Sequence, residues 1–264
     1  MEKRVAYLRP GQVVGRLKKS SVIFVPVAPM EWHGPHLPLG VDAFDAEEVA
    51  MGVCEKVGGC VWPTLFWGSE RERSPKELGY LGFKPHEYVV GMDFPKNCLP
   101  SPYSPEDVFG VVIRETLRLV GTMGPKLAVL VNGHGAFNHI ETLKRLAIEF
   151  TNTTDLRVYF RLAFPQDLID AGTIAHAGAD ETSLMMYFHP ETVDLKTLPP
   201  KGKKFKYRDF AIVDGPGFEG KGRPDKIVED DPRTLSSVER GRKFYQRSVN
   251  EIAEEVRLIL KGLK

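Results

Sequence analysis

The stretch SVIFVPVAPMEWHGPHLPLGVD, residues 21–42, decides how this chain folds. Residues 21–27 are apolar and rich in β-branched side chains, a pattern typical of a buried strand. The segment that follows holds Glu31, His33 and His36 among prolines and ends at Asp42. A loop that only had to be soluble would not need two histidines and a rigid frame. The stretch therefore indicates a buried strand that delivers titratable side chains to a site.

Outward from this stretch, strand-like and helix-like patterns alternate. The clearest further strand is residues 126–131, which breaks at an Asn-Gly pair. Two more strands are predicted at residues 60–68 and 156–164, and helices at residues 44–58, 104–124, 138–152 and 235–263. Such alternation favours an α/β fold with a mainly parallel sheet covered on both faces by helices.

Composition excludes several functional classes. The chain has 264 residues, 42% of them hydrophobic, with a net charge of +1, which suits one globular domain over residues 1–264. This charge offers no general attraction to nucleic acid or to an anionic membrane. The longest apolar runs have the length of strands and are too short to span a membrane. The first residues contain no apolar signal core, which favours a cytoplasmic location.

Four titratable residues follow two strands that are predicted to be parallel. In such sheets the carboxyl ends of the strands share one edge, so Glu31, His33 and Asp42 should lie beside His134. Glu31 and His33 are two residues apart and point the same way in an extended segment. Oxygen and nitrogen ligands without thiolate suit Zn, Mn or Fe. Two carboxylates can hold two such ions if one of them bridges.

Other titratable residues have simpler explanations. We interpret His36 as a packed side chain that holds the loop, and His139 as structural. Asp45 is most simply a charge near the start of a helix, favoured by the helix dipole. In the segment IAHAGADETS, residues 174–183, His176 can act as a general acid or base with Glu181 to orient it. An ordinary helix start with an incidental histidine remains the alternative.

Three blocks of the sequence, PMEWHGPHLPLGVD, VLVNGHG and HAGADETS, together resemble the creatininase (creatinine amidohydrolase) family. This resemblance implies a three-layer α/β/α fold, two divalent metal ions and a homohexamer. By position, Glu31 and His134 match ligands of one metal and His33 a ligand of the other. Asp42 matches the bridging carboxylate, and His176 matches the histidine that assists proton transfer.

One position departs from the family pattern. Creatininase carries a metal-binding glutamate two residues after the histidine of N-G-H, and here that position is Ala136. We therefore do not expect this chain to hydrolyse creatinine. Glu181, which also matches its family block, is the candidate replacement ligand. The long segment 69–103 is expected to cover the site or a subunit interface, with Phe94 and Tyr103 as candidate pocket walls.

The resemblance implies a metal-dependent hydrolase. In that reading a metal-activated water attacks a carbonyl, in a cyclic amide or related C–N bond of a small polar substrate. Two alternatives remain open: a ring-opening C–C hydrolase of a cyclic diketone in inositol catabolism, and a non-catalytic metal-binding scaffold. The sequence feature that separates enzyme from scaffold is His176, since a scaffold needs no proton-transfer residue beside its metals.

Overall fold

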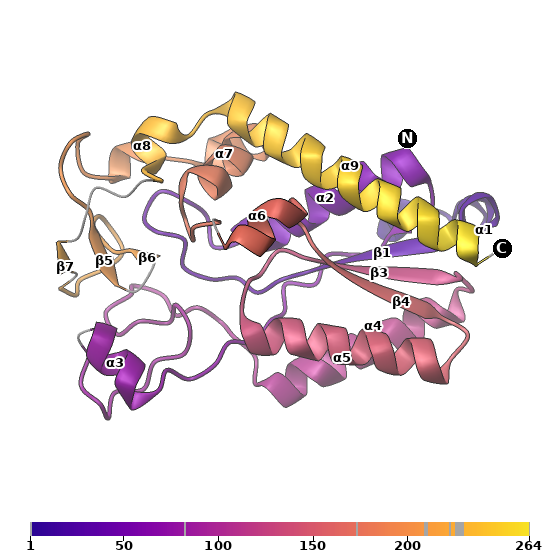
Figure 1. The fold of residues 1–264 in the computed structure, drawn as a ribbon, viewed down its shortest axis with the longest axis horizontal. Coiled ribbons are helices and arrows are strands. Elements are labelled where there is room, and N and C mark those ends of the chain that lie inside the picture. The colour runs from indigo at the N-terminus through magenta and orange to yellow at the C-terminus, as the bar shows by residue number, and fades with distance from the viewer. Residues whose placement is uncertain are drawn as a thin grey trace.

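The central feature of the computed structural model is a parallel four-stranded sheet in the order β2-β1-β3-β4 (Figure 1). Its strands are β1 (Val22–Val27), β2 (Cys60–Val61), β3 (Leu127–Asn132) and β4 (Arg157–Leu162). The structure describes residues 2–81, 83–172, 174–208, 211–221, 223–224 and 230–263. The predicted parallel sheet is confirmed, although β2 is shorter than the strand predicted at residues 60–68.

Helices cover both faces of this sheet, which confirms the three-layer arrangement (Figure 1). On one face lie α4 (Glu106–Thr122) and α5 (Phe137–Thr153), and on the other α2 (Val41–Val57) and α9 (Val238–Gly262). Alternation along β1 explains both contacts, because Ile23 and Val25 pack with α4 and α5, whereas Phe24 packs with α2 and α9. Every residue of β1 and β3 is buried, as expected for central strands of a parallel sheet.

A second, antiparallel sheet lies at the end of the molecule that also carries α3 (Pro75–Leu81) (Figure 1). Its strands are β5 (Lys206–Arg208), β6 (Ala211–Ile212) and β7 (Arg223–Pro224), in the order β6-β5-β7. A small core joins it to the long segment 69–103 and includes Trp32, Leu78 and Phe94. The expectation that Phe94 is a pocket wall is wrong, because Phe94 belongs to this core and is not among the residues that line the cavities at the carboxyl ends of β1 and β3.

The remaining helices connect these parts. They are η1 (Val5–Tyr7), α1 (Pro10–Lys19), α6 (Gln166–Ala171), α7 (Ala179–Phe188), η2 (Pro190–Thr192), η3 (Leu195–Thr197) and α8 (Pro232–Leu235). The helix predicted at residues 104–124 is observed as α4, which begins at Glu106 with Pro105 as its N-cap. Among the described helices, none combines the length and the apolar character needed to cross a membrane.

A close approach between two segments sets up the site. The turn after β3 packs so tightly on the start of α2 that a Cβ atom at Gly133 would lie 1.9 Å from the carbonyl oxygen of Asp42. Only glycine fits there, because backbone atoms cannot move aside as a side chain can. The same turn is fixed by Asn132, whose amide donates to the carbonyl of His134 at 2.7 Å.

Candidate metal centre

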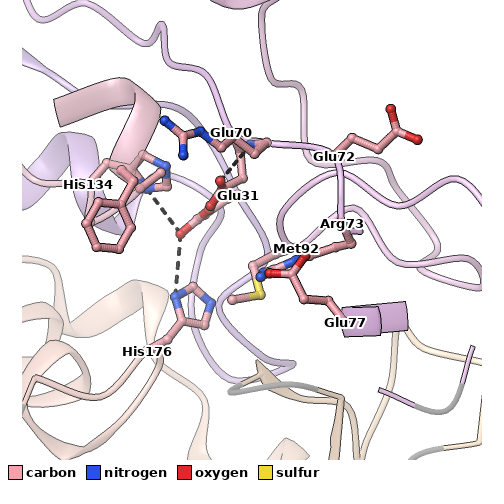
Figure 2. Close-up of a pocket in the computed structure, with 12 residues that line it drawn as sticks. Glu31, Glu70, Glu72, Arg73, Glu77, Met92, His134 and His176 are labelled. Carbon is pink, nitrogen blue, oxygen red and sulfur yellow. Dashed lines mark hydrogen bonds and ion pairs between the residues drawn. The ribbon is translucent and has the colours of Figure 1, made fainter. Parts of the chain in front are cut away.

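The carboxyl ends of β1 and β3 open into a cavity of about 600 Å³. Figure 2 shows Glu31, His134 and His176 together on one side of it. The structure brings all of the predicted site residues to this place: Glu31 and His33 after β1, Asp42 in the first turn of α2, His134 after β3, His176 before α7, and Glu181 in the first turn of α7. The side-by-side placement expected from the strand ends is therefore observed.

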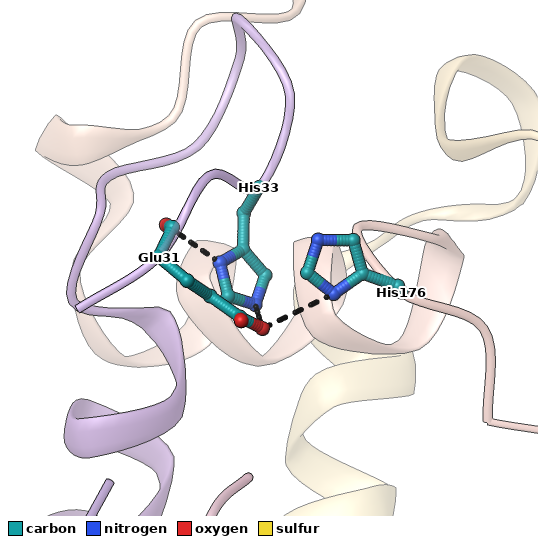
Figure 3. Close-up of side chains that lie close together, drawn as sticks. All are labelled: Glu31, His33 and His176. Atoms are coloured by element: carbon teal, nitrogen blue, oxygen red, sulfur yellow. Dashed lines mark hydrogen bonds and ion pairs between the residues drawn. The ribbon is translucent and has the colours of Figure 1, made fainter. Parts of the chain in front are cut away.

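One carboxylate oxygen of Glu31 faces two neighbouring imidazole rings (Figure 3). Its Oε1 is 3.8 Å from Nε2 of His33 and 3.5 Å from Nδ1 of His176. The Nδ1–H of His33 donates to the backbone carbonyl of Glu31 at 3.1 Å, because a carbonyl can only accept. This bond leaves Nε2 of His33 facing the carboxylates, and such a second bond is how proteins usually orient a metal-binding histidine.

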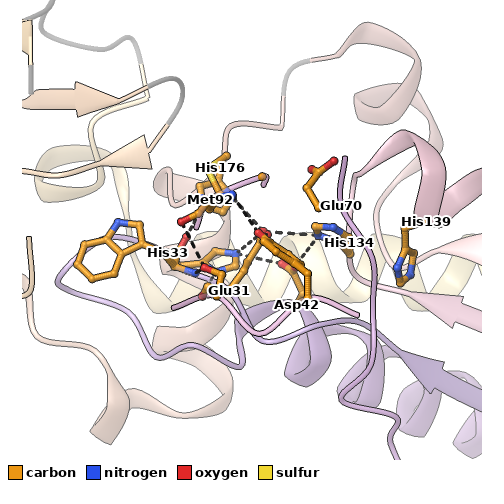
Figure 4. A network of polar contacts seen from close by, with 12 residues as sticks. Glu31, His33, Asp42, Glu70, Met92, His134, His139 and His176 are labelled. Atoms are coloured by element: carbon orange, nitrogen blue, oxygen red, sulfur yellow. Dashed lines mark hydrogen bonds and ion pairs between the residues drawn. The ribbon is translucent and has the colours of Figure 1, made fainter. Parts of the chain in front are cut away.

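Asp42 is the centre of the polar network (Figure 4). Its Oδ1 is 3.0 Å from Nε2 of His33, and its Oδ2 is 2.9 Å from Nδ1 of His134. The same Nδ1 is 3.5 Å from Oε1 of Glu31, and Nε2 of His33 is 3.8 Å from Oε2 of Glu181. One carboxylate therefore faces two histidines with one oxygen each, and each histidine faces a further carboxylate.

These contacts define two sets of donor atoms that share Asp42. One set is Glu31, Asp42 and His134, and the other is His33, Asp42 and Glu181. In each set the ligand atoms lie within 4.8 Å of one another, and all the residues are buried. Carboxylate and imidazole donors without thiolate fit Zn, Mn or Fe. The donor set therefore fits two divalent ions with one carboxylate between them.

The buried carboxylates of the cluster are balanced by positive charge on His33 and His134. Burial by itself lowers the pKa of His33, but the carboxylates of Asp42, Glu181 and Glu31 together outweigh burial and raise the pKa to about 10. Burial opposes the charge of His134 as well, yet Glu31 and Asp42 raise its pKa well above the ordinary value. Burial also acts against the ionised form of Asp42, whose pKa the two histidines nevertheless hold low. Protons and metal ions therefore compete for the same nitrogens.

His176 differs from the other two histidines. Burial, and then the positive charge of His33, lower its pKa to about 4, so its ring is neutral at pH 7. Its Nε2–H donates to the backbone carbonyl of Trp32 at 2.6 Å, which leaves Nδ1 with a lone pair facing Glu31. The next residue, Ala177, has a φ of 54°, which is rare for a residue with a Cβ. His176 also completes a third donor set with Glu31 and His33.

Glu181 lies where a ligand for the second set is needed. Its Oε2 accepts the backbone N–H of Ala177. Burial raises the pKa of this carboxyl to about 8, although His33 acts in the opposite direction. Ala136 is the N-cap of α5 and lines the first cavity, so its methyl group leaves room at the edge of the centre.

Sequence reasoning missed the role of Tyr103. We expected a pocket wall, but its hydroxyl donates to Oε2 of Glu31 and accepts the backbone N–H of Met92 at 3.1 Å. Burial, followed by the charge of Glu31, raises the pKa of the phenol well above its ordinary value. Tyr103 therefore holds Glu31 in place from the segment 69–103. The only signal in the sequence was a tyrosine in an overlong loop.

The other titratable residues divide into two groups. His36 is packed as predicted, with Nε2 3.1 Å from Oγ1 of Thr182, and His139 stacks on Phe109 with ring centroids 4.4 Å apart. The interpretation of Asp45 as a helix-end charge is wrong. It is 1% exposed and lies beyond the first turn of α2, and neither carboxylate oxygen has a hydrogen-bond partner among the described residues. Burial, followed by the charge of Glu181, raises its pKa well above normal.

The fold and the centre define the class of the protein. A parallel α/β sheet carries, at the carboxyl ends of its strands, a buried set of donors for divalent metal ions beside a neutral histidine. That combination defines a metal-dependent hydrolase.

Comparison with known proteins identifies the family. The sequence profile described as "Creatininase: Creatinine amidohydrolase" matches residues 6–85 and 103–256, so the chain belongs to the creatininase family. Creatinine amidohydrolase of Pseudomonas putida is 25% identical over 89% of this chain and 88% of its own length. The mycofactocin precursor peptide peptidase of Mycobacterium ulcerans (strain Agy99) is 28% identical over 89% of this chain and 84% of its own length. A solved structure described as "Creatininase Mn" has a TM-score of 0.65 at 22% identity, and the match covers 98% of this chain and 99% of that one.

Proposed function

We propose that this protein hydrolyses an amide-type C–N bond of a small molecule other than creatinine, with two divalent metal ions at the centre. The observation that carries the proposal is Asp42, a buried carboxylate shared by two donor sets beside the neutral ring of His176. The two curated relatives are named as an amidohydrolase and a peptidase, and both names describe cleavage of a C–N bond.

Each donor set has a distinct place in the proposal. Glu31, Asp42 and His134 hold one ion, and His33, Asp42 and Glu181 hold the other. Mn, Zn and Fe all accept these donors. The solved structure described as "Creatininase Mn" supports Mn among them. When bound, the ions polarise the substrate carbonyl and lower the pKa of water. Ala136 supports a substrate other than creatinine, because the family's glutamate is absent there.

The protein's own part in the reaction is proton transfer and orientation. Nδ1 of His176 accepts a proton on the substrate side and delivers it to the leaving nitrogen, while the bond to Trp32 fixes the ring. Tyr103 holds Glu31 from the opposite side. A non-catalytic scaffold would have no use for a neutral, fixed imidazole at this position. No specific feature of the described residues favours the cyclic-diketone reaction over amide hydrolysis.

The test is metal content per chain, measured by plasma mass spectrometry on protein purified without chelator, together with hydrolysis of a panel of cyclic and linear amides. We expect two ions in the wild type, one in Glu181→Gln, and two in His176→Asn with turnover reduced by about 10²–10⁴. Glu115→Gln, on the exposed face of α4, is the control and should match the wild type.

Two results would contradict the proposal. If His176→Asn loses an ion, the histidine is a ligand rather than the proton-transfer group. If the wild type binds two ions but opens cyclic diketones and leaves every amide intact, the alternative reaction replaces the proposed one.

A further inference from the structure

Two cavities meet at the metal centre and differ in character. The first has a volume of about 600 Å³, and the second about 700 Å³. Both include Glu31, Gly135, Phe137 and His176, so both reach the same reacting position. We call the outer part of the first cavity the charged lobe, and it is lined by Glu70, Arg71, Glu72, Arg73 and Glu77. We call the outer part of the second the apolar lobe. Most of its lining is apolar, from Ile140, Leu162, Phe164, Leu168, Ile169 and Ile174, and Glu141 and Lys144 also line it.

The apolar lobe has a firm wall. Phe164 is 5% exposed and belongs to a buried cluster with Leu184 and Phe244. Leu162, Leu168, Ile169 and Ile174 pack against that cluster and are themselves only partly buried. All four also line the second cavity, so part of their surface is available to a ligand there. Exposed apolar surface in a concave site is where binding of an apolar group gains most from the release of water.

The charged lobe lies on the other side of the centre. Figure 2 shows it between the group Glu31, His134 and His176 and the segment that carries Glu72, Arg73 and Glu77. Arg71 forms an ion pair with Glu141 of α5, which ties this segment to the main body. Groups of both signs line the lobe, so it suits a hydrogen-bonding or charged part of a ligand and excludes a purely apolar one.

The apolar lobe reaches the donor atoms themselves. Its cavity is also lined by Asp42 and Glu181, which belong to the second donor set. A molecule that fills the lobe therefore touches the centre, which marks the lobe as a place for part of the substrate. A small polar ring would occupy the centre and leave the apolar walls in contact with water.

We propose that the substrate is a bipartite amide, with a branched aliphatic or aromatic group in the apolar lobe and a polar or charged group in the charged lobe. This inference rests on the proposed function. Hydrolysis adds water across the C–N bond: the acyl carbon takes the oxygen and becomes a carboxylate, and the nitrogen takes both protons of the water and leaves as an ammonium group. The two products separate into the two lobes.

The test uses hydroxamic acids, which bind metal centres without being hydrolysed. Binding of acetohydroxamic acid, 4-methylpentanohydroxamic acid and phenylacetohydroxamic acid to the metal-loaded protein is measured by isothermal titration calorimetry. Each buried methylene strengthens binding about fourfold. The two larger probes should therefore bind at least about tenfold more tightly than acetohydroxamic acid.

Matched substitutions locate the effect. Ile169→Gln and Ile174→Gln place a polar group in the apolar lobe and should reduce the preference for the larger probes to less than about threefold. Both variants should keep the wild-type affinity for acetohydroxamic acid, which shows that the centre is folded and loaded. Ile148→Gln, at a position 62% exposed on α5, is the control and should retain the full preference.

The outcomes separate the two proposals. If acetohydroxamic acid binds but the larger probes gain nothing, the bipartite substrate is rejected and the hydrolase proposal stands. If Ile148→Gln weakens the larger probes as much as Ile169→Gln does, the apolar lobe is not their site and the inference is rejected. If no hydroxamate binds the metal-loaded protein, the proposed function fails, and the inference fails with it.

Discussion

The two ends of the main sheet carry opposite kinds of charge. At the carboxyl end, Asp42 is buried with two further carboxylates and two histidines, and the partly buried His176 lies beside them. At the amino end is a cleft of about 550 Å³. Of the residues that the structure describes, no Asp or Glu lines it, and six cationic side chains do: Lys18, Lys19, Lys56, Lys126, Arg257 and Lys261. The same strands therefore end in a buried, mixed cluster on one side and a solvated, basic rim on the other.

Helix direction accounts for part of the difference. α2 and α7 begin at the carboxyl end with Asp42 and Glu181 in their first turns, where the helix dipole favours negative charge. α1, α2 and α9 end at the amino end, where carbonyls lack partners within the helix and cations are favoured. Lys126 donates to the carbonyl of Leu263 at 3.0 Å, and Arg257 donates to that of Lys56 at 2.9 Å.

The comparison shows that a charged side chain near a helix end can either stabilise that helix end or bind a ligand. Whether the side chain is exposed or buried distinguishes the two roles. Exposed cations that contact terminal carbonyls stabilise helix ends by small amounts, because water screens them. Buried carboxylates and histidines cannot be justified in that way, because removing them from water is costly unless their charges are balanced. The buried charges at the carboxyl end of the sheet therefore indicate a bound ligand. The exposed cations at the amino end are explained by the helix ends alone.

The largest effect is expected for Asp42→Asn. The amide keeps the shape of the side chain but removes the charge shared by both donor sets, so both metal ions should be lost and turnover should fall to background. Metal content and amide hydrolysis, measured with the thermal melting curve, check this. A variant that keeps full metal content and turnover would show that Asp42 does not bridge.

Metal removal should expose the dependence of the centre on pH. Burial lowers the pKa of His33, but Asp42, together with Glu181 and Glu31, raises it to about 10, above the ordinary value of 6.5. The ion pairing of protonated His33 with these carboxylates therefore stabilises the folded state fully below pH 6.5. This stabilisation is lost as the pH rises through about 10. For chelator-treated protein, urea unfolding across this range should reveal a loss on the order of a few kcal/mol.

The metal-loaded protein provides the control for this titration, because bound ions replace the protons on the ring nitrogens. Its free energy of unfolding should change little between these pH values. An equally steep fall in the loaded protein would assign the pH dependence to groups outside the centre.

A smaller effect is expected for Tyr103→Phe. Loss of the hydroxyl removes the bond to Glu31 while the ring stays packed, and removal of such a supporting group costs about 10–100-fold in metal affinity or activity. Metal affinity by competition with a chelating dye measures this. Tyr88→Phe, in the same long segment but 71% exposed, should behave as the wild type. If both variants bind metal with the same affinity, the hydroxyl of Tyr103 does not support the metal centre.

The smallest effect is expected at the amino end. Lys126→Ala removes one exposed contact with a terminal carbonyl and should lower the free energy of unfolding by no more than about 1 kcal/mol, less at high salt. Metal content and turnover should be unchanged. A change in turnover would mean that the two ends of the sheet are coupled.

Much of the site was readable from the sequence because its residues follow strands with strong apolar patterns. The position of His134 after β3 and of Glu31 and His33 after β1 needed only the rule for parallel strands. Tyr103 and Asp45 were misjudged because the direction of a loop side chain, and the burial of one face of a helix, depend on what packs against them. The small antiparallel sheet was missed because strands of two or three residues carry no readable period.

The close packing of Gly133 on Asp42 has a consequence for the order in which the protein matures. Asp42 and His134 are 92 residues apart in the chain, so their contact forms only after β1 and β3 have paired and α2 has docked. Glu181 comes later still, on α7. A growing chain that has emerged only as far as α5 presents one donor set without the other. The donor set Glu31, Asp42 and His134 is therefore complete in the chain before the set that needs Glu181.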